Sequence, residues 1–150
     1  MKPKGIMRRR IVRKSKKRIK TRHKVVSISK LIKTADKLFS DAVRQIGANK
    51  EGLQVCYTCG HKNHWKKLQC SHFLSRYYKS ARWDFDNARP TCFMCNIWKK
   101  GDLVNFRQKL LKEIGQKRVE VVEAKRHQST KLTRAFLEEK LQELLSRPQE

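Results

Sequence analysis

The sequence predicts an α+β protein in which a small core, held together by two cysteine pairs, is flanked by α-helices and preceded by a basic arm. Three observations lead to this prediction. Apolar residues recur at three- and four-residue steps on both sides of the middle of the chain, the helical period is lost between residues 53 and 101, and that middle stretch carries two C-x-x-C pairs. The length of 150 residues is that of one ordinary domain, so we expect a single domain over residues 27–150.

The basic arm covers residues 1–26. Residues 1–24 contain thirteen Lys or Arg and no acid, and a segment with so much like charge cannot bury a core, so we expect the arm to be disordered. The whole chain has 38 Lys plus Arg against 13 Asp plus Glu, a net charge of +25. A field of this sign attracts polyanions: nucleic acid is the expected partner, and an anionic membrane surface is the weaker alternative. No apolar run is long enough for a membrane span or a signal peptide, so we expect no membrane insertion and no secretion.

The regular elements follow in order along the chain. The first helix is expected over residues 29–47, with Ser29 as its N-cap and Gly47 as its stop. The core spans residues 53–101, with short strands at 52–57, 67–73 and 88–91 and an irregular loop at 74–87. Helical spacing returns over residues 102–147: one stripe stops at Gly115, a short second one follows, and the third begins near Ser129 or Thr130. We expect these helices to pack on the core, with partner binding by the last one as the alternative.

The two C-x-x-C pairs predict a structural zinc site. Each pair offers two thiolates from one tight turn, and two such turns complete a tetrahedron around Zn²⁺, which contributes to folding where the apolar core is small. The expected ligands are Cys56, Cys59, Cys92 and Cys95. Five cysteines are an odd number for a disulfide framework, so we expect a reducing, cytoplasmic environment.

A second partition of the zinc ligands is open. Cys70 and His72 could join the first cysteine pair in a Cys₃His site, which would leave the second pair without a metal. If the four C-x-x-C cysteines bind the zinc, Cys70 is either a small buried apolar residue or a neighbour that contacts the zinc ligands. His61 and His64 lie close to the first pair, and we expect both to be exposed rather than ligands.

A further set of polar residues surrounds the cysteine pairs. His72 lies in QCSHF (69–73), Asn87 ends DFDN (84–87), and Asn96 follows the second pair directly. This order resembles the HNH, or ββα-metal, nuclease core. More narrowly, LQCSHFLSR (68–76), RWD (82–84), Asn87, PTC (90–92), Cys95-Asn96 and KLFSD (37–41) resemble the phage NinG/Rap recombination endonucleases, which are related to endonuclease VII-type resolvases.

The resemblance implies roles for these residues. His72 would be the general base, because an imidazole takes a proton from water near neutral pH. Asn96 would reach a catalytic divalent ion, and a carboxamide oxygen suits Mg²⁺ or Mn²⁺ better than zinc. Asn87 would orient His72 through the backbone. Many HNH nucleases have an aspartate ligand directly before the catalytic histidine; here Ser71 stands there, so the second ligand is unassigned, and the nearest candidates are Asp84 and Asp86.

The expected function is a metal-dependent endonuclease that cuts branched or recombination-intermediate DNA. The cations expected to hold the DNA strand are Arg76, Arg82, Arg89, Lys99 and Lys100. Tyr77, Tyr78 and Trp83 suit unstacked bases, although core filling is the preferred interpretation of Trp83. A junction presents two related strands, so a homodimer is expected. The alternatives are a non-catalytic zinc-ribbon protein that binds nucleic acid, ribosome-associated or transcriptional, and a general nicking HNH enzyme of phage packaging or restriction.

Overall fold

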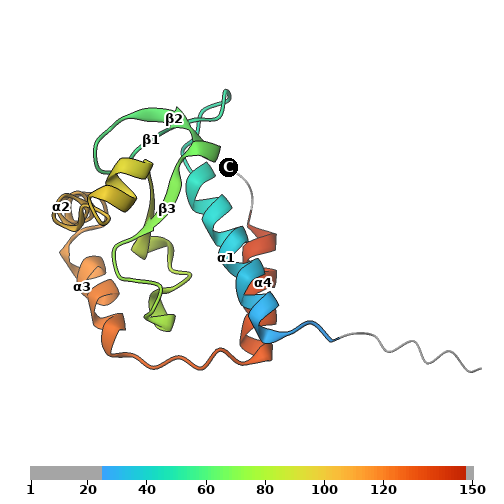
Figure 1. Cartoon of the computed structure of the whole chain (residues 1–150). Coiled ribbons are helices and arrows are strands. Elements are labelled where there is room, and N and C mark those ends of the chain that lie inside the picture. Colours follow the sequence, from blue (N-terminus) through green and yellow to red (C-terminus); the bar gives the residue numbers. More distant parts are fainter. Residues whose placement is uncertain (1–24, 148–150) are drawn as a thin grey trace, which may run out of the picture.

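A computed structural model of the chain describes residues 25–147, so residues 1–24 of the expected basic arm lie outside the described part. The described part is α+β, as the sequence predicted (Figure 1). Its helices are α1 (Ile28–Gln45), α2 (Leu103–Ile114), α3 (Gln116–Ala124) and α4 (Arg134–Ser146). Its strands are β1 (Leu53–Val55), β2 (Lys62–His64), β3 (Gln69–His72) and β4 (Ala88–Thr91). Among residues 25–147, no helix combines the length and the apolar character that crossing a lipid bilayer requires.

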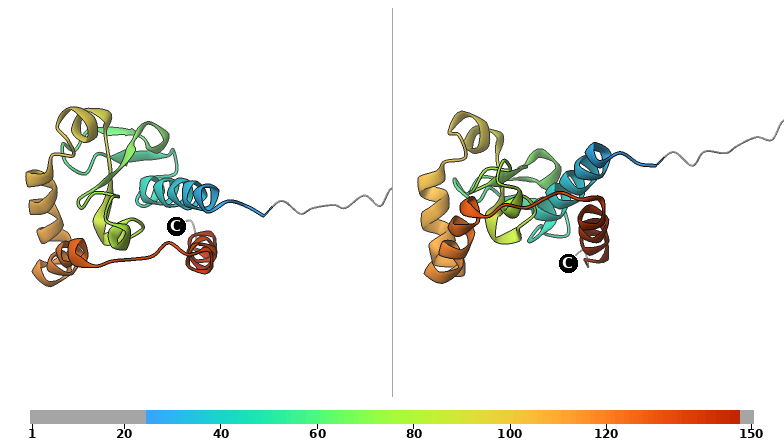
Figure 2. Two further views of the ribbon diagram at one scale, coloured as in Figure 1. Left: turned by 60° about the horizontal axis from the view of Figure 1, so that its bottom comes forward. Right: turned by 90° about the horizontal axis from the view of Figure 1, so that it is seen from below.

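The strands form two small antiparallel hairpins, β1–β2 and β3–β4. The second hairpin pairs Gln69 with Thr91 and His72 with Ala88. It lies between two pairs of helices, with α1 and α4 on one side and α2 and α3 on the other (Figure 1). Residues 128–133 pass beneath this hairpin and connect the two sides (Figure 2).

The first core lies between the β3–β4 hairpin and the α1–α4 pair. Helix α1 forms because apolar residues recur at three- and four-residue steps, and this stripe is what it buries. The buried members of this core are Leu31, Ala35, Phe39, Val43, Trp83, Ala88, Leu137 and Leu144.

The second core is smaller and lies on the other side of the hairpin. Phe106 and Leu110 of α2 and Val119 of α3 are fully buried, with Tyr57 and Phe73 packed against them. The rings of Phe73 and Phe106 are stacked with 5.9 Å between their centroids. Gly115 separates the two helices with a φ of 81°, a backbone angle that a residue with a side chain rarely adopts.

Two helix starts differ from the prediction. Helix α1 begins at Ile28, one residue earlier than expected, because Ser27 rather than Ser29 is its N-cap: the Ser27 hydroxyl accepts a hydrogen bond from the Lys30 amide at 3.3 Å. Helix α4 begins at Arg134 rather than near Ser129 or Thr130, because the Thr133 hydroxyl caps it by accepting from the Phe136 amide at 3.3 Å. Helix α1 ends at Gln45 rather than at residue 47, and Gly47, with a φ of 78°, follows the C-cap Ile46 as the predicted stop.

The core between residues 53 and 101 holds one strand that the sequence did not predict. Strand β2 is Lys-Asn-His, which has no apolar alternation, and it forms because its backbone pairs with β1. Strand β4 has the predicted bounds. The loop at 74–87 contains two short 3₁₀ turns, η2 (Lys79–Ala81) and η3 (Phe85–Asn87), and the residues after β4 form a π-helical turn, η4 (Met94–Trp98). Two more 3₁₀ turns, η1 (Trp65–Lys67) and η5 (Lys125–His127), follow β2 and α3.

Candidate functional site

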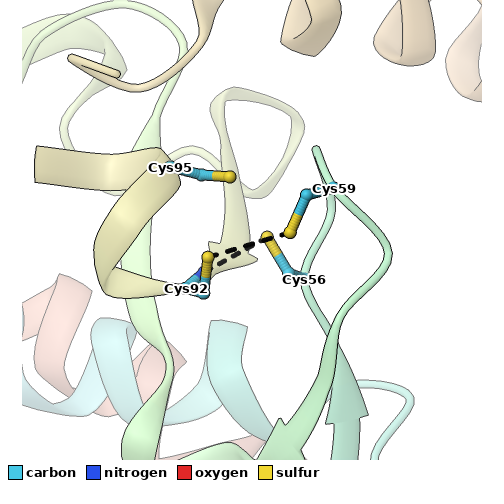
Figure 3. Close-up of side chains that lie close together, drawn as sticks. All are labelled: Cys56, Cys59, Cys92 and Cys95. Carbon is cyan, nitrogen blue, oxygen red and sulfur yellow. Dashed lines mark hydrogen bonds between the residues drawn. The ribbon is translucent and has the colours of Figure 1, made fainter. Parts of the chain in front are cut away.

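Four cysteines from three segments converge beside the β3–β4 hairpin. Cys56 and Cys59 come from the turn between β1 and β2, Cys92 follows β4, and Cys95 lies in η4 (Figure 3). All four Sγ atoms lie within 4.8 Å of one another, and those of Cys59 and Cys92 are 3.8 Å apart. A tetrahedron with Zn–S bonds of about 2.3 Å has S···S edges of about 3.8 Å. The cluster can therefore hold a metal ion such as zinc, with the ligands that the spacing predicted.

The protein around Cys56 favours ionised sulfur, whereas burial raises the pKa of Cys95 to about 12. The backbone amide of Cys92 donates a hydrogen bond to Cys56 Sγ at 3.2 Å, and the Thr58 hydroxyl lies 3.5 Å from the same sulfur. Burial alone would raise the pKa of Cys56, but hydrogen bonds from the backbone of Cys59 and Cys92 outweigh it and lower the pKa to about 6. A thiolate is the form that binds metal.

The structure does not bring together the ligands of the alternative Cys₃His site. Cys70 lies on the face of β3 that packs against the first core, away from the four-cysteine cluster. Burial raises the pKa of Cys70 to about 12, so it stays a thiol. His61 is exposed, and Nδ1 of the half-buried His64 accepts a hydrogen bond from the Lys66 amide at 3.2 Å.

His72 lies at the end of β3, against α1. Its Nε2 is 3.1 Å from the carbonyl oxygen of Arg82; a carbonyl only accepts, so Nε2 carries the proton and Nδ1 keeps the free lone pair. Its ring centroid lies 5.8 Å from that of Phe39. Burial, together with the positive charges of Arg76 and Arg82, lowers the pKa of His72 below its ordinary value despite the Arg82 carbonyl. His72 is therefore neutral at neutral pH and able to accept a proton.

Asn87 fixes the loop that contacts His72. Its side chain is fully buried; Oδ1 accepts from the Leu74 amide at 2.6 Å, and Nδ2 donates to the carbonyls of Leu74 and Ala81 at 2.8 and 2.9 Å. Ala81 directly precedes Arg82, whose carbonyl contacts His72. The link between Asn87 and His72 thus runs through the backbone.

Asn96 lies on the opposite face of the hairpin from His72. Its Nδ2 donates to Oε1 of Gln69 at 2.7 Å, which leaves the Asn96 oxygen as an acceptor. Successive strand residues point to opposite faces, so Gln69 and Ser71 share one face of β3, and Cys70 and His72 share the other. The structure does not bring the His72 and Asn96 side chains together.

The two acidic candidates are both paired with cations. Asp84 Oδ2 accepts from Lys125 at 2.7 Å, and Asp86 accepts from Arg118 through both carboxylate oxygens. Apart from the four-cysteine cluster, no group of three or more His, Cys, Asp and Glu side chains converges among residues 25–147. Use of Asp84 or Asp86 as a metal ligand stays a prediction that these contacts do not support.

The five candidate cations for DNA separate into two sets. Arg82 forms a bidentate ion pair with Asp36, with N···O distances of 2.8 and 2.6 Å, and Arg89 pairs with Glu113 at 2.8 Å. These two guanidinium groups hold the fold together. The remaining three side chains are exposed and have no ion pair within residues 25–147: Arg76, Lys99 and Lys100.

The three aromatic candidates also divide. Tyr77 is 83% exposed, Tyr78 is half-buried, and Trp83 belongs to the first core, which confirms core filling as its role. The indole nitrogen of Trp83 donates to Asp36 Oδ1 at 2.9 Å. Asp36 was missed by the sequence analysis. It is the only acid among the first nine residues of α1, Ile28–Asp36. It also directly follows the buried Ala35, and this position was the one indication in the sequence that Asp36 contacts another part of the fold.

The fold and the cluster together define an α+β protein built around a four-cysteine site that can hold a metal such as zinc. A family model described as "Bacteriophage Lambda NinG protein" matches residues 3–148. The chain therefore belongs to the phage NinG family. No curated protein and no solved structure matches it.

Proposed function

We propose that this protein is a DNA endonuclease that cuts branched recombination intermediates, with His72 as the general base. The observation that carries the proposal is the setting of His72 at the end of β3: its neutral imidazole is held at Nε2 by the carbonyl of Arg82, which lies in a loop that Asn87 fixes at three points. A base of this kind contributes about 10²–10⁴-fold to a hydrolysis rate. The likeness to the HNH core is part of the proposal and rests on the order of elements along the chain: strand β3, the loop fixed by Asn87, strand β4 and the helical turn η4.

The residues near His72 suit a phosphodiester. Arg76 is exposed, close enough to affect the pKa of His72, and has no ion pair within the described part of the chain. Its guanidinium can hold a phosphate oxygen while His72 Nδ1 takes the proton of the attacking water. Arg82 has a structural role, and its backbone carbonyl accepts the hydrogen bond from Nε2 of His72.

A requirement for Mg²⁺ or Mn²⁺ is also part of the proposal. Such an ion supplies positive charge to the reacting phosphate, and Mg²⁺ commonly binds through few protein ligands, waters and the phosphate itself. The described residues do not build a complete ligand set, because Asn96 lies on the other face and both nearby aspartates are paired. We therefore assign no step to the ion.

One observation favours a second function, a non-catalytic zinc module that binds nucleic acid. His72 and Asn96 lie on opposite faces of β3–β4, and a binding module has no need for them to meet. Both functions need a reducing compartment, such as the cytoplasm of a host cell, because the four clustered cysteines can hold a metal only while they are not oxidised to disulfides.

Cleavage of a synthetic four-way junction separates the two functions. The zinc-loaded protein should cut the junction when Mg²⁺ or Mn²⁺ is added, and His72→Ala should lower the cleavage rate by about 100-fold or more. The matched control is His61→Ala, which removes an exposed imidazole from the cysteine turn and should cut normally.

Zinc content and junction affinity are measured for each variant, and both should be unchanged in His72→Ala. If the wild-type protein binds junctions but cuts no DNA with either ion, the zinc-module function is correct. If His72→Ala cuts as well as the wild type, the assignment of the base is wrong. Sedimentation of the junction complex tests whether the expected homodimer forms.

A further inference from the structure

Exposed apolar side chains gather around the π-helical turn η4 and the first turn of α2. Trp98 and Val104 are each 72% exposed, and the residues between Cys92 and Asn105 contain four more large apolar side chains that are 46–56% exposed. We call this surface the apolar knob; its members are Phe93, Met94, Ile97, Trp98, Leu103 and Val104. A concentration of this kind on a small domain marks an interaction site more often than chance exposure.

The knob is a consequence of the metal centre. Cys95, the second residue of η4, is 1% exposed and turned toward the other three cysteines (Figure 3), whereas Met94, Ile97 and Trp98 of the same turn are exposed. The turn is held by the Lys99 amide, which donates to the Met94 carbonyl at 3.0 Å, and by the Gly101 amide, which donates to the Cys95 carbonyl at 2.9 Å. Single π-helical turns occur frequently at functional sites, and a rigid turn loses little entropy on binding.

The charges around the knob indicate what it binds. Lys99 and Lys100 follow Trp98 directly, both are exposed, and the sequence has no acid from Asn87 to Gly101. The next acid, Asp102, is engaged by the amide of Asn105 at 2.9 and 3.0 Å. An exposed indole beside two ammonium groups is complementary to an unpaired base and the phosphates next to it, since stacking on an aromatic side chain is worth about 1–3 kcal/mol per base.

We propose that the apolar knob is a binding site for unpaired bases of DNA, with Trp98 as the stacking residue and Lys99 and Lys100 on the adjoining phosphates. This inference rests on the proposed function, because unpaired bases occur where a DNA duplex branches. It assigns branch recognition to the metal-held turn, a different part of the molecule from His72.

Charge argues against two other occupants from this chain. The segment 1–24 carries thirteen cations and no acid, so Lys99 and Lys100 repel it. A second copy would bring another net charge of +25 to the same surface. A DNA strand instead gains from both the apolar contact and the ammonium groups.

The test compares a forked duplex, with 2-aminopurine as its first unpaired base, against a fully paired duplex of the same length. Zinc-loaded full-length protein is used without added Mg²⁺ or Mn²⁺, so that binding is measured without cutting. Trp98→Ala should weaken binding to the fork by about tenfold and to the paired duplex by less than about twofold. Trp98→Phe, which keeps an aromatic ring, should retain most of the fork affinity, and the wild type should quench 2-aminopurine fluorescence.

Leu145→Ala is the matched control, because Leu145 on α4 is 68% exposed, lies outside the apolar knob and has no ring. It should leave both affinities unchanged, and equal losses from the two alanine variants would refute stacking. The proposal is also overturned if Trp98→Ala binds the fork normally, whether or not it alters dimerisation in sedimentation or binding to phosphatidylserine vesicles.

Cleavage assays with Mg²⁺ distinguish the proposed nuclease function from the proposed base-binding site. If His72→Ala cuts normally while Trp98→Ala loses fork binding, the function assigned to His72 fails and the base-binding site is supported. If His72→Ala is inactive while Trp98→Ala binds and cuts the fork normally, the base-binding site is refuted and the nuclease is supported.

Discussion

Replacing Asn87 with alanine is expected to cost a large part of the stability of the domain. The side chain is fully buried and satisfies three backbone groups: the amide and carbonyl of Leu74, which is 5% exposed, and the carbonyl of Ala81, which is 0% exposed. Each buried polar group left without a partner costs about 1–2 kcal/mol, so the variant should lose about 3–6 kcal/mol. A domain of this size has a free energy of unfolding of only about 5–15 kcal/mol.

The assay is urea unfolding followed by far-UV circular dichroism at saturating zinc. Asn105→Ala is the matched control, since Asn105 is exposed and donates only to Asp102; its effect should stay within about 0.5 kcal/mol. Asn87→Asp should be at least as damaging as alanine at neutral pH, because a carboxylate would face two carbonyl oxygens. A loss below about 1 kcal/mol for Asn87→Ala would refute the reasoning.

Three further results are expected. Cys92→Ala should lose both zinc and the folded state, whereas Cys70→Ala should keep one zinc per chain by atomic emission, because only Cys92 belongs to the four-sulfur cluster; equal zinc loss would contradict this. Burial lowers the pKa of His72 in the folded state below its value of about 6.5 in the unfolded chain. The free energy of unfolding should therefore be highest above the unfolded pKa and should fall as the pH drops through the lowered folded pKa. Urea midpoints at several pH values should show this loss in the wild type and a smaller one in His72→Gln. Arg82→Ala should lower the free energy of unfolding by about 1–3 kcal/mol with little change in DNA affinity, and Arg76→Ala should do the reverse.

The metal cluster was predictable because its chemistry is local. Two thiolates three residues apart reach one ion from a single turn, and this constraint holds whatever the rest of the chain does. The stops at Gly47 and Gly115 were predictable for a similar reason, since both glycines have a positive φ, which few other residues adopt.

The partners of the charged residues were not predictable in this way. Arg82 is 46 residues from Asp36, and Arg89 is 24 residues from Glu113, so neither ion pair leaves a pattern in the sequence. Both arginines were predicted to bind DNA because they lie close to the candidate site in the sequence. In the structure they form ion pairs that stabilise the fold. The separation of His72 from Asn96 depends on the register in which β3 pairs with β4. A shift of one residue in this pairing would move each side chain of the strand to the opposite face of the hairpin.

Strand β4 connects the metal centre to the candidate base. Asn87, which fixes the loop at His72, directly precedes this four-residue strand, and Cys92 of the four-cysteine cluster directly follows it. Within the strand, Ala88 pairs with His72 and Thr91 pairs with Gln69, the hydrogen-bond partner of Asn96. We therefore expect a change in the position of Cys92 to affect the loop, Gln69 and Asn96 through this short strand. The cysteine cluster and the loop at His72 therefore lie at the two ends of one strand, and the register of that strand puts the imidazole on the face of α1 and the amide on the opposite face.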